Sequence, residues 1–201
     1  MRETNIVIAG VGGQGVLSAS RLVAQAAIDA GQRVVVGDTF GASQREGSVM
    51  STVRIGDGVR GALVALGSAD FLIAFEPYEA LRRLHFLREG AAVIVNSAPV
   101  IPVRQVLEGG YPSLDDVWKR IEARCGTLHR MGASEEAAKI AARHGSRYDV
   151  TNAVILGAAC TLPGFPVSED QLVSMMKARF KASSLPMNLE ALEFGKTTAA
   201  A

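Results

Sequence analysis

A glycine-rich turn near the N-terminus is the feature that most constrains how this chain can fold. An apolar run at residues 5–9 leads into Gly-Val-Gly-Gly-Gln-Gly at residues 10–15, and residues 16–30 then place apolar side chains at helical spacing. Glycines permit a tight turn, and the unpaired amides and dipole at a helix N-terminus attract a phosphate. The candidate ligand-binding residues here are Gly10, Gly12, Gly13, Gln14 and Gly15. The alternative is a turn that only packs helix against strand.

The rest of the chain continues the alternation of strands and helices. Residues 33–37 complete a strand–helix–strand unit, and the runs at 71–75, 91–95 and 127–131 predict further strands. Residues 48–55 and 59–66 are typical of a β-hairpin, because Gly56, Asp57 and Gly58 between them favour a tight turn. From residue 134 onward the pattern is helical. The sequence therefore predicts an α/β, Rossmann-like three-layer fold with a mostly parallel sheet, an inserted β-hairpin and a helical C-terminus, in a single domain over residues 1–201.

A polar loop at residues 38–48 follows the second strand, beside the expected phosphate turn. Asp38 stands where the ribose-binding acid of an NAD site is expected. Arg45 is suited to a bidentate contact with a phosphate or carboxylate. Thr39 and Gln44 in this loop, and Asn96 at the end of a later strand, are further candidates for cofactor binding. The alternative is a solvated surface loop.

Composition narrows the class of protein. A hydrophobic fraction of 48% and a net charge of +1 indicate a globular protein and argue against nucleic acid as a partner. No apolar run approaches the roughly 20 residues that span a bilayer, and no signal-peptide pattern is found, so we expect a cytoplasmic protein without membrane contact. Cys125 and Cys160 are expected to be reduced thiols, and two cysteines are too few for an iron–sulfur cluster, which takes about four thiolates. We expect no catalytic and no metal-binding residue in this chain.

The helix predicted over residues 151–162 is apolar on nearly every side. Such a helix is either buried on all faces within its own chain or packed against a partner chain. The sequence therefore leaves open whether this segment, or the methionine-bearing helix after it, belongs to a subunit interface.

Several motifs in a fixed order carry a family resemblance. They are residues 10–16 (GVGGQGV), 40–49 (FGASQREGSV) and 53–56 (VRIG), followed by the pairs 69–70, 76–77, 96–97, 151–152 and 188–189. With these motifs the chain resembles, over essentially its whole length, the gamma subunit or gamma domain of 2-oxoacid:ferredoxin oxidoreductases. Within that group it is most similar to the beta subunit of indolepyruvate ferredoxin oxidoreductases. Glu46 departs from the family pattern, because the family usually has a glycine there.

The resemblance implies a subunit that holds neither thiamine diphosphate nor iron–sulfur clusters and is inactive alone. In that family a larger partner subunit carries both groups, decarboxylates a 2-oxo acid of the indolepyruvate or other aryl-pyruvate type, and passes electrons to ferredoxin or another acceptor. Coenzyme A receives the acyl group, and the resemblance implies that the glycine-rich turn helps to bind it. Residues 56–58 resemble the start of a thiamine motif, but the paired asparagines expected after it are absent.

Two other classes of enzyme share a glycine-rich turn after the first strand. One is a self-contained NAD-binding Rossmann oxidoreductase, for which this chain has no evident acid–base or nucleophile constellation. The other is an adenylating enzyme of the ubiquitin-activating type, whose zinc cysteines and lysine–aspartate pattern are not apparent here.

Overall fold

The computed structural model describes residues 3–40, 47–101 and 110–200. Its elements in chain order are β1 (Thr4–Val11), α1 (Val16–Asp29), β2 (Val34–Phe40), β3 (Ser48–Ile55), β4 (Ala69–Ala74), α2 (Pro77–Arg83), a 3-10 turn η1 (Leu84–Phe86), β5 (Leu87–Asn96), α4 (Leu114–Glu122), β6 (Thr127–Met131), α5 (Ala133–Arg143), α6 (Thr151–Ala159), α7 (Glu169–Arg179) and α8 (Leu185–Ala200).

The strands form one mixed sheet in the order β2-β3-β1-β4-β5-β6. The pairs β1–β4, β4–β5 and β5–β6 are parallel, whereas β3 runs antiparallel to both of its neighbours, β1 and β2. Five of the six strands therefore point the same way, and the predicted mostly parallel α/β sheet is confirmed. The insertion of β3 separates β1 from β2, so the two strands of the first strand–helix–strand unit are not neighbours.

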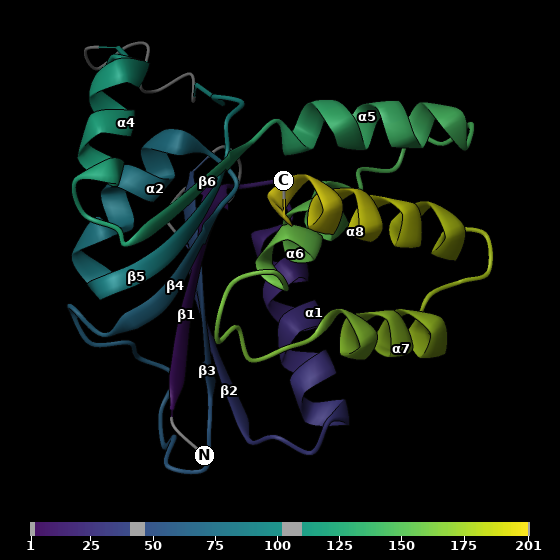
Figure 1. Ribbon diagram of the computed structural model, residues 1–201, viewed down its shortest axis with the longest axis horizontal. Coiled ribbons are helices and arrows are strands. Elements are labelled where there is room, and N and C mark those ends of the chain that lie inside the picture. Colours follow the sequence, from purple (N-terminus) through teal and green to yellow (C-terminus); the bar gives the residue numbers. More distant parts are fainter. Residues whose placement is uncertain (1–2, 41–46, 102–109, 201) are drawn as a thin grey trace.

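Helices cover both faces of this sheet, which gives the predicted three layers (Figure 1). Side chains of a strand alternate between the two faces. Ile6 and Ile8 of β1 accordingly pack into one core cluster with α1 and the C-terminal helices, whereas Val7 and Ala9 pack into a second cluster with α2 and α4. None of the helices described is long and apolar enough to cross a membrane.

The prediction that residues 59–66 form the second strand of a hairpin is wrong. Residues 59–66 form a loop, although the turn at Gly56 does end β3, with the amide of Val59 donating to the Gly56 carbonyl at 3.2 Å. The physical reason is that β3 is already paired on both edges, by β1 and by β2, so it has no free edge for a further strand. The hairpin is formed instead by β2 and β3, which are consecutive strands in the chain and pair antiparallel.

Helix α6 is buried within this chain rather than against a partner. All its residues except Asn152 are buried, and α8 packs along it. The crossing is close enough that a Cβ on Gly157 would lie 1.9 Å from the Leu192 carbonyl oxygen, and one on Gly195 would lie 1.8 Å from the Val154 carbonyl oxygen. The possibility that residues 151–162 form a subunit interface is therefore wrong, because this chain's own helices occupy that surface.

Candidate ligand-binding site

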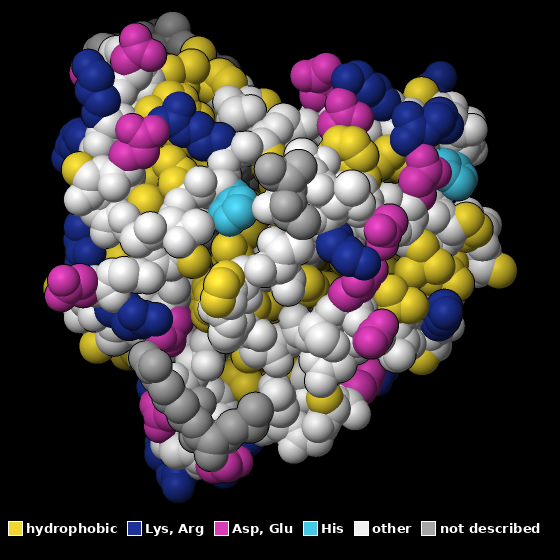
Figure 2. Space-filling model, viewed as in Figure 1, with side chains coloured by type: hydrophobic (Ala, Val, Ile, Leu, Met, Phe, Trp, Pro, Cys, Tyr) yellow, Lys and Arg dark blue, Asp and Glu magenta, His cyan; other side chains and the backbone are white. Residues whose placement is uncertain are grey.

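The candidate site lies at the carboxyl ends of β1, β4 and β5. Connections from β1 lead to one side of the sheet and connections from β4 to the other, and ligands of open α/β sheets bind at such a reversal. In the space-filling view the outline of the molecule is notched at this end, between the α2–α4 side and α5 (Figure 2).

The glycine-rich turn presents free amides at the start of α1. Gly15 is the N-cap of this 14-residue helix, with φ of 86° and no side-chain cap, and Gly13 has φ of 100°. The amide of Gly12 donates to the Gly47 carbonyl at 2.8 Å, and that of Gln14 donates to the Val11 carbonyl at 3.1 Å. Within the described parts of the chain, the amides of Gly13 and Gly15 have no hydrogen-bond acceptor. These are the groups that an anion at a helix N-terminus would use.

The glycines of the turn serve two different purposes. A Cβ on Gly10 would lie 2.9 Å from Gln14 Oε1, and a Cβ on Gly15 would lie 2.8 Å from Asn152 Nδ2 of α6, so both glycines allow close packing. A Cβ on Gly13 would meet nothing within 4 Å. The packing explanation therefore accounts for Gly10 and Gly15, and Gly13 faces open space.

The side chains of Gln14 and Asn96 hold the strand ends together. Gln14 Nε2 donates to the carbonyl of Phe75 at 3.0 Å, and Asn96 Nδ2 donates to the same oxygen at 3.1 Å. Gln14 Oε1 accepts the amide of Val11, while Asn96 also bonds both the hydroxyl and the amide of Ser134. The structure thus brings these two predicted site residues together on one carbonyl, and through it links β1, the end of β4, β5 and α5.

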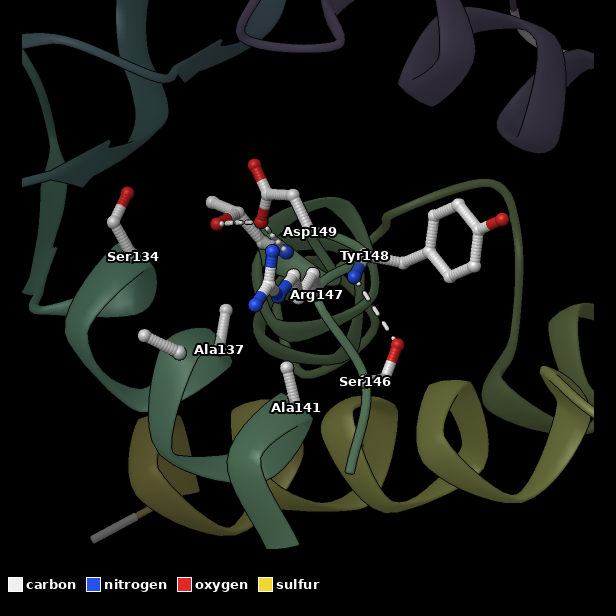
Figure 3. A pocket seen from close by; sticks show the side chains of 9 residues that line it. Ser134, Ala137, Ala141, Ser146, Arg147, Tyr148 and Asp149 are labelled. Atoms are coloured by element: carbon white, nitrogen blue, oxygen red, sulfur yellow. Dashed lines mark hydrogen bonds between the residues drawn. The ribbon is translucent and has the colours of Figure 1, made fainter. Parts of the chain in front are cut away.

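A hollow of about 310 Å³ lies between α5 and the segment that leads into α6 (Figure 3). On α5 it is lined by Ser134, Ala137, Ala138 and Ala141, and on the facing segment by Ser146, Arg147, Tyr148, Asp149 and Thr151. The hollow adjoins the glycine-rich turn because Ser134 bonds Asn96, and because a Cβ on Gly15 would lie 2.8 Å from Nδ2 of Asn152, the neighbour of Thr151.

The polar side chains that line this hollow differ in how free they are to bind a ligand. Asp149 Oδ1 accepts the amide and hydroxyl of Thr151, at 2.8 and 2.6 Å, and so stabilises the start of α6. Arg147 is exposed and has no carboxylate partner among the described residues, and Tyr148 is 78% exposed. The hollow therefore offers a cation without a carboxylate partner among the described residues, and the exposed ring of Tyr148 lies at its rim, pointing away from α5 (Figure 3).

Buried carboxylates occupy the other face of the same edge, and the sequence analysis did not single them out as functional. Glu76 is 1% exposed; it accepts the amide of Glu79 at 2.8 Å and the hydroxyl of Tyr111. Burial raises the pKa of Glu76, and the hydrogen bond from Tyr111 opposes that shift. The signal that could have found them is two acids directly after a buried apolar strand.

Glu79 anchors the end of the polar loop to this edge. Its Oε2 accepts the hydroxyl of Ser48 at 2.5 Å, and Arg83 Nη2 donates to the same Ser48 hydroxyl at 2.6 Å. Ser48 pairs with Val11 across β3 and β1, directly before the glycine-rich turn. Burial lowers the pKa of Arg83, and the charge of Glu79 opposes this change.

Asp38 does not lie where an NAD site requires it. Because β3 is inserted, Asp38 on β2 is two strand spacings from β1, about 10 Å, and its carboxylate accepts the Ser51 hydroxyl at 2.6 Å. The self-contained NAD-binding alternative is therefore not favoured. Thr39 is exposed on β2, opposite Met50. Residues 41–46, which include the predicted Gln44 and Arg45 and the unusual Glu46, lie outside the described residues.

Comparisons with known proteins agree with this fold. The family model described as "Pyruvate ferredoxin/flavodoxin oxidoreductase" matches residues 5–197, and the chain belongs to that family. It is 42% identical, over 97% of its length and 95% of the relative, to indolepyruvate oxidoreductase subunit IorB of Thermococcus kodakarensis. The resemblance stated from the sequence motifs is thereby confirmed.

Solved structures are similar to this one throughout its length. Pyruvate oxidoreductase subunit PORC of Thermotoga maritima superposes with a TM-score of 0.72 at 22% identity, covering 98% of this chain and 97% of that one. The 2-oxoglutarate:ferredoxin oxidoreductase of Magnetococcus marinus, solved with 2-oxoglutarate, coenzyme A and succinyl-CoA, gives 0.71 at 25% identity. In that case all of this chain corresponds to 31% of the longer chain.

Proposed function

We propose that this chain is the subunit of a 2-oxoacid:ferredoxin oxidoreductase that holds neither thiamine diphosphate nor iron–sulfur clusters, and that it acts with a larger subunit that holds both. Its family and its relatedness to IorB subunits support this assignment. The same relatives favour indolepyruvate or another aryl-pyruvate as the 2-oxo acid. The complex would form an acyl-CoA and pass the electrons to ferredoxin or another acceptor.

Within that complex, this chain's proposed role is to bind coenzyme A at the glycine-rich turn. The observation that carries the proposal is that the amides of Gly13 and Gly15, at the start of α1 and beside open space, have no acceptor among the described residues. A pyrophosphate there would receive two backbone hydrogen bonds and the favourable field of the helix dipole. The thiol of bound coenzyme A would accept the acyl group formed on the partner subunit.

The adjoining hollow suits the nucleotide end of the same molecule. Arg147 supplies a cation for a further phosphate, and the exposed ring of Tyr148 supplies a surface on which a base can stack. Gln14 and Asn96 would act by holding the strand ends in place, since their amides are engaged within the protein. Gln44 and Arg45 remain predicted contacts from the polar loop.

The test compares two glycines of similar conformation at opposite ends of α1. Gly13 and Gly31 both have positive φ, 100° and 78°, and a Cβ on either would meet nothing within 4 Å. Both Gly13→Val and Gly31→Val strain the backbone, but only the first places a side chain over the proposed phosphate site. We expect Gly13→Val to raise the coenzyme A concentration required for half-maximal turnover of the assembled enzyme by about ten-fold or more, equivalent to about 1.4 kcal/mol. Gly31→Val should leave that concentration unchanged.

Two charge variants make the test independent of backbone strain. Arg45→Ala and Arg147→Ala should each weaken coenzyme A binding, measured by titration calorimetry, because a hydrogen bond to a charged phosphate contributes about 1.5–3 kcal/mol. If Gly13→Val and both arginine variants bind coenzyme A as the unmodified protein does, the turn is only structural.

A further inference from the structure

The third layer of this fold is incomplete. On the face that carries α2 and α4, helix α2 packs on β1, β4 and β5, and α4 packs on α2 and β6. Over β2 and β3 the covering segment is the loop at residues 59–66, hereafter the 59–66 loop. Its Ala62 lies so close to β2 that a Cβ on Gly37 would be 2.7 Å from the Ala62 Cβ, and its Val64 is buried in the core cluster of that face. A single layer of loop thus replaces a helix on this half of the sheet.

Two leucines of this loop project into solvent. Leu63 is 87% exposed and Leu66 is 71% exposed, whereas Val64 between them is 7% exposed. Isolated exposed leucines are common, but two on one short segment, over a thinly covered sheet, make an apolar patch of the kind that marks an interaction site.

The backbone that carries these leucines is held by the sheet beneath it. Thr52 Oγ1 donates to the Ala62 carbonyl at 2.8 Å, and Arg54 Nη1 donates to the carbonyls of Gly61 and Leu63 at 2.9 and 3.2 Å. A segment already fixed in this way loses little further conformational entropy when it binds a partner. The leucines are therefore presented as preorganised anchors rather than as the tips of a loose loop.

The charge around the patch indicates what kind of surface covers it. Arg54 is paired with Glu3 at 3.1 Å. The exposed Arg33 and Arg60 have no carboxylate partner within the described ranges. Arg60 Nη1 donates only to the backbone carbonyls of Asp57 and Val59. Two copies of this chain meeting here would bring two sets of unpaired arginines together, which is unfavourable. A partner with carboxylates around an apolar pocket is complementary.

We propose that the 59–66 loop is a docking surface for the larger subunit, with Leu63 and Leu66 as apolar anchors and Arg33 and Arg60 as its charged rim. This inference rests on the proposed function, because it takes the larger subunit as the partner. The position fits that role: Thr52 lies under the loop, and Ser48, on the same face, is the first residue of β3 and pairs with Val11 directly before the glycine-rich turn. A subunit docked here extends along the sheet to the strand ends that form the candidate site.

The test is the affinity of the whole chain for the larger subunit, measured by titration of the two purified subunits. Leu63→Asp and Leu66→Asp should each raise the Kd by about ten-fold or more, because each substitution replaces a buried apolar anchor of the interface with a charge. Ile28→Asp is the matched control, because Ile28 is 49% exposed on α1, across the sheet, and it should leave the Kd unchanged. Thermal unfolding of each isolated variant should match that of the unmodified chain.

Charge variants test the rim. Arg60→Glu and Arg33→Glu should raise the Kd most at low ionic strength, whereas Lys177→Glu on α7, an equal change in charge on the opposite face, should not. Unchanged affinity of the leucine variants would overturn the docking surface while leaving the proposed function intact. If the isolated chain forms a dimer that Leu63→Asp dissociates, the surface joins two copies and the proposal is wrong. Failure of the unmodified chain to bind the larger subunit would refute both.

Discussion

Two polar side chains at the strand ends, those of Gln14 and Asn96, share one hydrogen-bond acceptor. The oxygen of Phe75 accepts hydrogen bonds from both Gln14 and Asn96, and the amide of Phe75 donates to Ala9 at 2.8 Å. Buried polar groups cost free energy unless they are paired, so these bonds fix how the ends of β1, β4 and β5 sit against one another. The amides of Gly13 and Gly15, which have no acceptor in the described part of the chain, are therefore held on a rigid support, as a ligand-binding turn requires.

Glu76 gives the protein a pH-dependent contribution to its stability. Burial raises the pKa of this carboxyl above its ordinary value of 4.5, so its stabilising contribution is fully present below pH 4.5 and is lost as the pH rises through the higher folded-state pKa. Glu76→Gln removes the titration along with one acceptor. We expect the destabilisation caused by Glu76→Gln, measured as the free energy of unfolding in urea, to be larger at pH 4 than at pH 7.

Glu89→Gln provides the control for that measurement. Glu89 is exposed, and its side chain makes no hydrogen bond or ion pair within the described residues. The same substitution there should change the free energy of unfolding by less than about 0.5 kcal/mol. A destabilisation by Glu76→Gln that is equal at the two pH values would show that the carboxyl does not titrate abnormally.

At the scale of elements, the crossing of α6 and α8 depends on two glycines. A Cβ at Gly157 would overlap the backbone of α8, which cannot move aside as a flexible side chain can. We expect Gly157→Ala to destabilise the protein by about 3 kcal/mol, because overpacking a close-packed core forces backbone shifts. Gly132→Ala is the control: Gly132 has φ of −80°, and its Cβ would meet only Glu135 Oε2, at 3.9 Å. Chemical denaturation of both variants measures the difference, and equal stabilities would contradict the close crossing.

At the scale of the whole molecule, we expect the purified chain to be colourless and to oxidise no 2-oxo acid on its own. It has two cysteines, fewer than the four or so thiolates of an iron–sulfur cluster. Burial raises the pKa of Cys160 to about 12, and that of Cys125 is also raised, so neither thiol is readily deprotonated. Turnover measured with an artificial electron acceptor should appear only after the larger subunit is added. Activity of the chain alone would contradict the proposed function.

Much of the fold could be predicted from local patterns in the sequence. The apolar run at 71–75 overlaps β4 and the run at 91–95 lies in β5, and Ser168 with Gln171 forms a capping box at the start of α7. These features depend on residues close in sequence, for which propensity, periodicity and capping chemistry are sufficient. The glycine-rich turn was located for the same reason.

Tertiary structure decided what depends on residues far apart in the chain. The sequence could not show that β3 enters between β1 and β2, which removes Asp38 from the NAD position and leaves residues 59–66 without an edge to pair with. Nor could it show that α8 encloses α6, since an apolar helix looks the same whether its own chain or a partner covers it.

The sequence by itself determined most of the helices and strands, the family and the position of the turn at residues 10–15. Only the structure distinguished the roles of the residues at the strand ends. Gly10 and Gly15 allow close packing, Gln14 and Asn96 hold the strand ends, and Gly13 faces open space. The physical reason is that a side chain's partners are set by strand order and helix crossing, which long-range packing selects from many arrangements that local pattern allows equally.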